Sequence, residues 1–125
     1  MVKNSPASLL KCPGSCMRIL IADSQMKVRY ALSVLLQEHP GWQIAGCIAD
    51  ARELLDRIGS LAPDVLLLDW KLPGMARLEL LHCIRHARAS LVIIAMSTNP
   101  EARHEALAQG YDYFVSKVDS PHKLL

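Results

Sequence analysis

The chain has 125 residues, of which 51% are hydrophobic and 21% charged. This length is typical of one domain, and the balance of apolar and charged residues excludes a disordered or collagen-like chain. The formal net charge of +2 is too small for a basic surface that neutralises many phosphates, so we expect no direct binding of nucleic acid.

The apolar runs are short, and the longest, such as residues 91–96, fall far below the roughly 18 residues of a membrane span. Residues 1–16 hold turn formers but no continuous apolar segment, so they predict a flexible N-terminal tail and not a secretory signal. We therefore expect a cytoplasmic protein that makes no membrane contact. In that reducing compartment four cysteines are expected to be free thiols: Cys12, Cys16, Cys47 and Cys83.

Five apolar runs alternate with segments of helical periodicity. The runs predict strands at residues 19–22, 42–48, 65–68, 91–96 and 113–115. Apolar side chains at the spacing of a helix face predict helices over residues 28–36, 54–61 and 78–84, and after residues 99–101. Asp50 and Asn99 are placed to cap two helices, and Gly110 is placed to end one.

The third and fourth predicted strands have no polar face, so both faces of their sheet must be covered. Repeated strand–helix units favour a parallel sheet with helices on both sides. We therefore predict a doubly wound α/β domain over residues 17–125. A fifth helix should start near Pro121 and is truncated at Leu125, which would leave part of one sheet face uncovered.

Four polar residues lie at or directly after the ends of four predicted strands. They are two carboxylates, one hydroxyl and one ammonium: Asp23, Asp69, Ser97 and Lys117. Ligands of such sheets bind outside the carboxyl ends of the strands, so we expect these side chains to be neighbours. A set of this composition can bind a phosphoryl group.

Three segments around these residues carry a family resemblance: residues 64–75 (DVLLLDWKLPGM), 92–98 (VIIAMST) and 110–117 (GYDYFVSK). Over residues 17–125 the chain resembles the receiver domain of bacterial two-component response regulators, especially the branch that precedes a LuxR/NarL-type helix-turn-helix domain. The resemblance implies a flavodoxin-like, five-stranded parallel sheet of order 2-1-3-4-5.

The resemblance also implies a phosphorelay. A sensor histidine kinase would transfer a phosphoryl group to Asp69, while Lys117 and Ser97 contact the phosphoryl oxygens. A Mg²⁺ ion would be held by Asp23, Asp69 and the backbone carbonyl of Lys71.

Ser97 and Phe114 would form the switch of such a receiver domain. Their movement would alter the surface made by the helix after the fourth strand, the fifth strand and the helix after it. That surface would control a DNA-binding output domain outside this chain, and it offers a place for a homodimer.

Two positions depart from the family pattern. Ser24 stands where the family has a second acidic residue, and a neutral hydroxyl weakens the hold on Mg²⁺. The side chain of Lys71 could lie over the acidic cluster and partly substitute for the ion. Ala76-Arg77 replaces a common Asp-Gly pair and is expected to alter the entry to the following helix. These departures leave open a phosphorylation-independent pseudo-receiver that acts as a protein interaction module.

Other functions fit the sequence less well. A flavodoxin-like cofactor binder would need a phosphate-binding loop after the first strand, which is missing. A hydrolase with an aspartyl nucleophile would want a second acid at the position of Lys71, so we do not expect an enzyme with its own substrate. His82, His86 and the adjacent Cys83 have no further ligand at a fixed spacing, which disfavours a zinc site.

Overall fold

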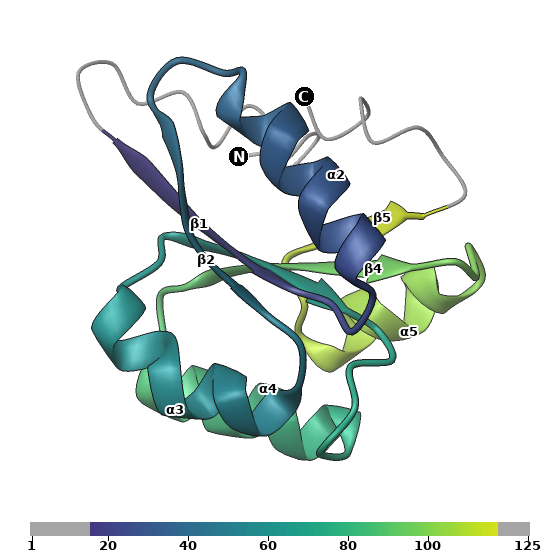
Figure 1. The fold of residues 1–125 in the computed structure, drawn as a ribbon. Coiled ribbons are helices and arrows are strands. Elements are labelled where there is room, and N and C mark those ends of the chain that lie inside the picture. The colour runs from purple at the N-terminus through teal and green to yellow at the C-terminus, as the bar shows by residue number, and fades with distance from the viewer. Residues whose placement is uncertain (1–15, 118–125) are drawn as a thin grey trace, which may run out of the picture.

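The computed structural model describes residues 16–117 (Figure 1). Its strands are β1 (Met17–Ala22), β2 (Trp42–Ile48), β3 (Val65–Asp69), β4 (Val92–Ser97) and β5 (Tyr113–Ser116). Its helices are α2 (Met26–Gln37), α3 (Ala51–Leu61), α4 (Arg77–Ala87) and α5 (Ala102–Gln109). The strands form one parallel sheet in the order β2-β1-β3-β4-β5, so the predicted flavodoxin-like fold is confirmed.

Predictions on the two ends fall outside the described residues. The expected tail covers residues 1–16, of which 1–15 are not described. The truncated fifth helix, and the sheet face that it would leave uncovered, concern residues 118–125.

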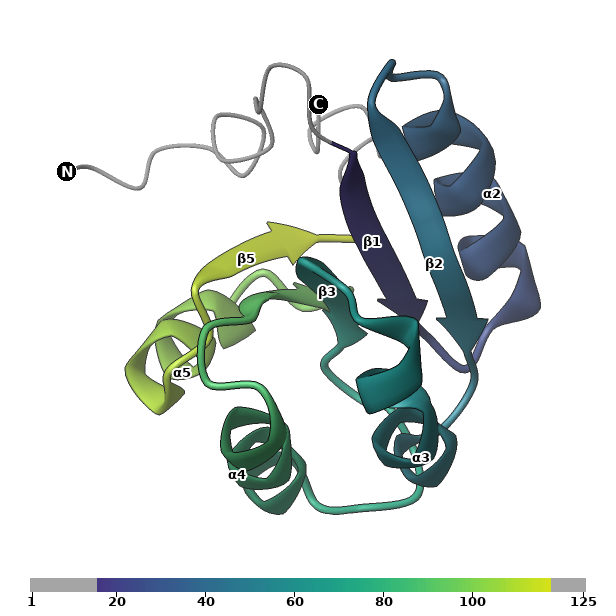
Figure 2. The ribbon, with the colours of Figure 1, turned by 90° about the vertical axis from the view of Figure 1, so that its left-hand side faces the viewer.

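Helices cover both faces of the sheet. Helix α2 packs on one face, whereas α3, α4 and α5 pack on the other (Figures 1 and 2). Between residues 16 and 117, no helix is long and apolar enough to cross a bilayer.

Strand β3 lies in the middle of the sheet and is buried on both faces. Leu66 and Leu68 belong to the apolar core on the side of α3, α4 and α5. Val65 and Leu67 belong to the core beneath α2. All four side chains are at most 2% exposed, as expected for a run with no polar face. This central strand places Asp69 at the carboxyl edge of a rigid sheet.

The helix boundaries follow local signals, with some shifts. Asp50 caps α3 as predicted, because its Oδ1 accepts a hydrogen bond from the Glu53 amide at 2.9 Å. Asn99 instead stabilises a turn ahead of α5, with its Oδ1 accepting from the Glu101 amide at 3.0 Å. Gly110 ends α5 with a φ of +108°, a conformation that favours glycine.

The edge strand β2 contains an irregularity. Ile19 pairs with Ile44, but Leu20 pairs with Gly46, so Ala45 is an extra residue in β2. A Cβ at Gly46 would lie 3.1 Å from a methyl carbon of Leu61, so glycine lets α3 approach this part of the sheet closely.

Arg85 ties α4 to the segments that flank β4 and β5. Its guanidinium donates hydrogen bonds to the carbonyls of Leu91 (2.5 Å) and Gly110 (3.1 Å) and to Asp112 Oδ2 (2.8 Å). Asp112 Oδ2 also accepts from the Ile93 amide at 2.8 Å. Both side chains are largely buried, so the pair holds β4 and β5 in register with α4.

We expect Arg85→Met to lower the free energy of unfolding by about 2 kcal/mol, because it removes the cation paired with the partly buried Asp112 carboxylate and the donor to two carbonyls. His86→Ala, at an exposed position of the same helix, should change it by less than about 0.5 kcal/mol. Urea denaturation of both variants measures the difference, and equal values would contradict a role for Arg85 in stability.

Candidate functional site

Three strand ends meet at one edge of the sheet. Asp23 follows β1, Asp69 is the last residue of β3, and Lys117 follows β5. The Lys117 ammonium contacts Asp23 Oδ2 at 2.5 Å and Asp69 Oδ1 at 3.0 Å. The predicted proximity of these side chains is therefore confirmed.

Backbone hydrogen bonds continue the sheet just beyond the strands and fix these positions. The Asp23 amide donates to the Ile48 carbonyl at 2.9 Å, and the Lys117 amide donates to the Ser97 carbonyl at 2.6 Å. After Asp69, the Trp70 amide donates to the Met96 carbonyl at 2.7 Å. The charged side chains thus project from ordered backbone and not from free loops.

The carboxylates of this cluster are buried. Asp23 is 0% exposed and Asp69 is 7% exposed. Burying a carboxylate is costly unless an opposite charge or a hydrogen-bond donor compensates. Burial alone lowers the pKa of Lys117, but hydrogen bonds and charges from Asp23 and Asp69 outweigh it and raise the pKa above its ordinary value. Lys117 is therefore an ammonium ion at neutral pH and compensates both carboxylates.

The two carboxylates differ in how many of their oxygens are engaged. Asp23 Oδ1 accepts from the Gln25 amide at 2.8 Å, so both oxygens of Asp23 have a donor. Asp69 Oδ1 accepts from Lys117 and from the Lys71 amide at 3.2 Å. Within residues 16–117, no donor contacts Asp69 Oδ2, which leaves that oxygen available.

A pocket of about 280 Å³ opens beside Asp69. It is lined by Ser24, Gln25, Asp69, Lys71, Ser97, Thr98 and Lys117. Ser97 is 2% exposed, and its Oγ accepts from the Asn99 amide at 3.0 Å, which leaves the hydroxyl proton available to another acceptor. The predicted hydroxyl, ammonium and one carboxylate therefore face a common space.

Phe114 lies further from the pocket, in the core on the side of α3, α4 and α5. Its ring is 6% exposed, and the Arg103 guanidinium of α5 lies 5.3 Å from the ring centre. The register pairs Phe114 with Ala95 and Ser116 with Ser97. Ser97 and Phe114, the predicted switch residues, thus occupy neighbouring strands two positions apart.

A cluster that sequence reasoning missed lies directly behind Asp69. Trp70 is 5% exposed, and the Arg77 guanidinium stacks 3.9 Å from its ring centre. Arg77 also donates to the Trp70 carbonyl at 3.4 Å and approaches Glu105 of α5 at 3.8 Å. The ring of Tyr111 lies 5.6 Å from that of Trp70, and burial raises the pKa of Tyr111 to about 12. The cluster connects the segment after Asp69 to α5, a role that the expected change in helix entry did not include.

Comparison with known proteins agrees with this geometry. The family model described as the response regulator receiver domain matches residues 19–125. The chain belongs to the response regulator receiver family. A protein-glutamate methylesterase/protein-glutamine glutaminase of Geobacillus kaustophilus is 33% identical over 110 residues, which are 86% of this chain and 32% of the relative. The nitrate/nitrite response regulator NarL of Escherichia coli K12 is 30% identical over 109 residues, which are 86% of this chain and 50% of NarL.

Solved receiver domains have the same fold. A DNA-binding response regulator of the LuxR family from Staphylococcus aureus has a TM-score of 0.75 and 27% identity, with 86% of this chain and 92% of that chain covered. The response regulator domain of Thermotoga maritima CheB has a TM-score of 0.73 and 25% identity, with 85% and 81% covered. The receiver chain spans a third to a half of the two curated relatives described above.

Receiver domains generally bind Mg²⁺, and the donors of this one fit such an ion poorly. Magnesium prefers charged oxygen ligands, but position 24 supplies an exposed serine and both oxygens of Asp23 already have protein donors. Among the described residues, no group of three or more His, Cys, Asp and Glu side chains could hold a metal ion. His82, His86 and Cys83 form no such group within that part of the chain.

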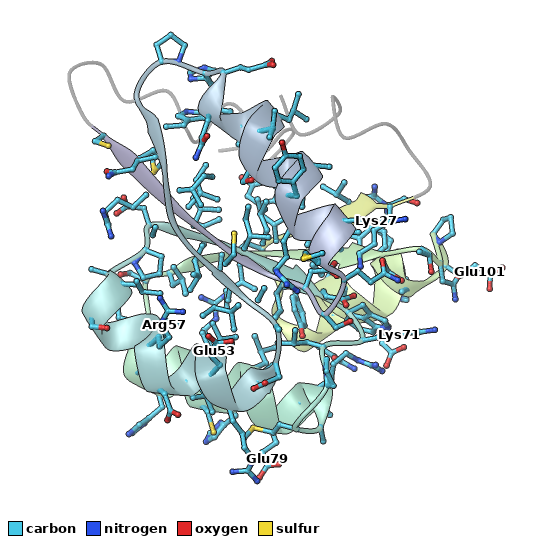
Figure 3. The ribbon with its side chains drawn as sticks, in the orientation of Figure 1. Lys27, Glu53, Arg57, Lys71, Glu79 and Glu101 are labelled. Atoms are coloured by element: carbon cyan, nitrogen blue, oxygen red, sulfur yellow. The ribbon has the colours of Figure 1, made fainter. Side chains whose placement is uncertain are left out.

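The side chain of Lys71 lines the pocket but forms no ion pair with its carboxylates among the described residues. Lys71 is exposed and lies at the periphery of the fold (Figure 3). In the described part of the chain its ammonium forms no ion pair with Asp23 or Asp69, and Lys117 occupies that position instead. Lys71 lines the pocket beside Asp69, and its amide donates to Asp69 Oδ1, so a covering role for its side chain stays a prediction.

Proposed function

We propose that this receiver domain accepts a phosphoryl group on Asp69 from a sensor histidine kinase. The observation that carries the proposal is the available Asp69 Oδ2 beside an ammonium that already contacts the same carboxylate at 3.0 Å. Transfer forms a bond between Asp69 Oδ2 and phosphorus and breaks the bond from phosphorus to the donor imidazole nitrogen, which keeps the electron pair.

The charges around the pocket suit this chemistry. An anionic donor is repelled by a bare carboxylate, and the Lys117 ammonium offsets that repulsion and stabilises charge on the phosphoryl oxygens. The Ser97 hydroxyl can donate a hydrogen bond to one of those oxygens. Asp69 is then the phosphoacceptor, while Ser97 and Lys117 bind the transferred group.

The response would pass from Ser97 and Phe114 to the surface formed by α5 and β5. We propose that this surface controls an output domain. A DNA-binding domain serves as the model, because the Staphylococcus aureus neighbour is a DNA-binding response regulator. We also propose that the surface offers a site for homodimer formation. In this role the receiver acts in the cytoplasm as a signalling module and has no substrate of its own. The methylesterase activity in the name of the Geobacillus relative is that of a whole protein, of which the matched segment makes up 32%.

One observation favours a second candidate function. Ser24 removes a charged oxygen at the position where the family has its second acid, and a receiver that cannot be phosphorylated would act only as a protein interaction module. Both candidates share the fold and differ in whether Asp69 reacts.

Exposure to acetyl phosphate or phosphoramidate, followed by intact-mass measurement, tests the proposal. We expect the native chain to gain the mass of one phosphoryl group and Asp69→Asn to gain none. Asp56→Asn, at an exposed position on α3, is the matched control and should react like the native chain. A native chain that stays unmodified would support the interaction module instead, and an adduct that persists in Asp69→Asn would contradict Asp69 as the phosphoacceptor.

A further inference from the structure

The acidic pocket carries its own counter-charge. Two buried carboxylates contribute two negative charges, and Lys117 neutralises one of them from a distance of 2.5 Å to Asp23 and 3.0 Å to Asp69. The side chain of Lys117 is 14% exposed, so water screens these contacts little. The position between the two carboxylates is therefore filled by a protein cation.

Asp23 is the key residue for this arrangement. Its carboxylate is fully buried, and its two oxygens are used by the Lys117 ammonium and the Gln25 amide. A divalent ion that shared Asp23 Oδ2 would lie beside the Lys117 ammonium and be repelled by it. Asp23 thus acts as an anchor for Lys117 and is a poor metal ligand.

Ser24 follows Asp23 in the sequence and lines the pocket, but it cannot supply the charged ligand that Asp23 withholds. It is exposed and lines the pocket, but its hydroxyl brings no charge to a hard cation. With Asp23 engaged, Asp69 is the one carboxylate with a free oxygen among the residues that line the pocket. Magnesium is usually held by one or two carboxylates together with several waters, so a single free carboxylate oxygen makes a weak site for it.

We infer that Lys117 is the resident cation of this pocket and competes with divalent ions for Asp23 and Asp69, while Ser24 denies those ions a charged ligand. This inference deepens the proposed phosphoacceptor function, because it assigns the pocket a different cation from the one expected for its family. It does not require that phosphorylation occurs.

Calorimetric titration with MgCl₂ tests the inference without any phosphoryl donor. Ser24→Asp should bind Mg²⁺ more tightly than the native chain by roughly tenfold or more, because it restores a charged oxygen at the pocket mouth. Ser24→Ala should match the native chain, since the hydroxyl contributes little. Ser90→Asp, which adds the same charge at an exposed site outside the pocket lining, should also match it.

A second variant isolates the competition. Lys117→Met should bind Mg²⁺ more tightly than the native chain, because the carboxylates lose their resident cation. Native binding as tight as that of Ser24→Asp, or no gain in either Ser24→Asp or Lys117→Met, would overturn the inference. The two hypotheses fail in different measurements. The proposed function fails if no phosphoryl adduct forms, whatever the Mg²⁺ affinity, whereas the inference fails in the MgCl₂ titration.

Discussion

Lys117→Met is expected to lower the free energy of unfolding by about 3 kcal/mol at neutral pH, since removal of one partner from a buried ion pair leaves an uncompensated charge. Here the remaining partners are Asp23, which is 0% exposed, and Asp69, which is 7% exposed. Methionine retains most of the apolar stem of lysine, so the loss reports on the charge and not on packing. Urea denaturation of native and variant chains measures it.

The pH dependence of this contribution follows from the direction of the Lys117 shift. Its pKa in the folded chain lies above the ordinary value of 10.5, so the folded state binds the proton more tightly than the unfolded state. The stabilisation is complete below that ordinary value and is lost as the pH rises through the folded pKa. The difference between native and Lys117→Met should therefore stay constant across neutral pH.

A double variant provides the control for Lys117→Met. Asp23→Asn combined with Lys117→Met removes one of the unpaired charges and should recover part of the lost stability. Ordinary surface substitutions change the free energy of unfolding by no more than about 0.5 kcal/mol. If Lys117→Met alone changed it by no more than that, the role of Lys117 as the counter-charge would be contradicted.

Trp70→Ala is expected to lower the free energy of unfolding by about 3 to 4 kcal/mol, the range for removal of a large buried aromatic side chain. The indole is 5% exposed and packs against Tyr111 on one side and the Arg77 guanidinium on another. Its loss leaves a cavity directly behind Asp69 and removes the surface on which Arg77 stacks. Trp70→Phe should cost less, because it retains an apolar ring.

Trp42→Ala is the matched control for an effect on the site. Trp42 is also buried, at 7% exposure, but it belongs to the core beneath α2, whereas Trp70 directly follows Asp69 and belongs to the core on the other side of the sheet. Both alanine variants should unfold at lower urea concentration, whereas only Trp70→Ala should reduce modification of Asp69 by acetyl phosphate under folding conditions. Equal loss of modification in both variants would contradict a local effect of Trp70.

Much of the fold could be predicted from sequence because its signals are local. The second strand was predicted with the observed bounds, Trp42–Ile48, since turn residues flank it on both sides. Helix α2 begins at Met26, two residues before the predicted start, because the apolar face used for prediction begins at Val28 and the exposed Met26 and Lys27 lie ahead of it. The proximity of Asp23, Asp69 and Lys117 was predictable because parallel strands end at the same edge.

The parts that were missed depend on tertiary contacts. Arg77 stacks on Trp70 and reaches Glu105, a contact between α4 and α5 that no sequence spacing indicates. One signal for Arg77 was present in the sequence: a long cation stands where the family commonly has glycine, seven residues after a tryptophan.

The extra residue Ala45 in β2 affects how two copies of this domain can meet. Among the described strands, β2 pairs with β1 alone, so its other edge could in principle accept a strand from a second molecule. A bulge bends and twists such an edge, so that an added strand cannot follow it in regular hydrogen-bonding register. Extension of the sheet at the β2 edge by a strand of a second molecule is therefore disfavoured.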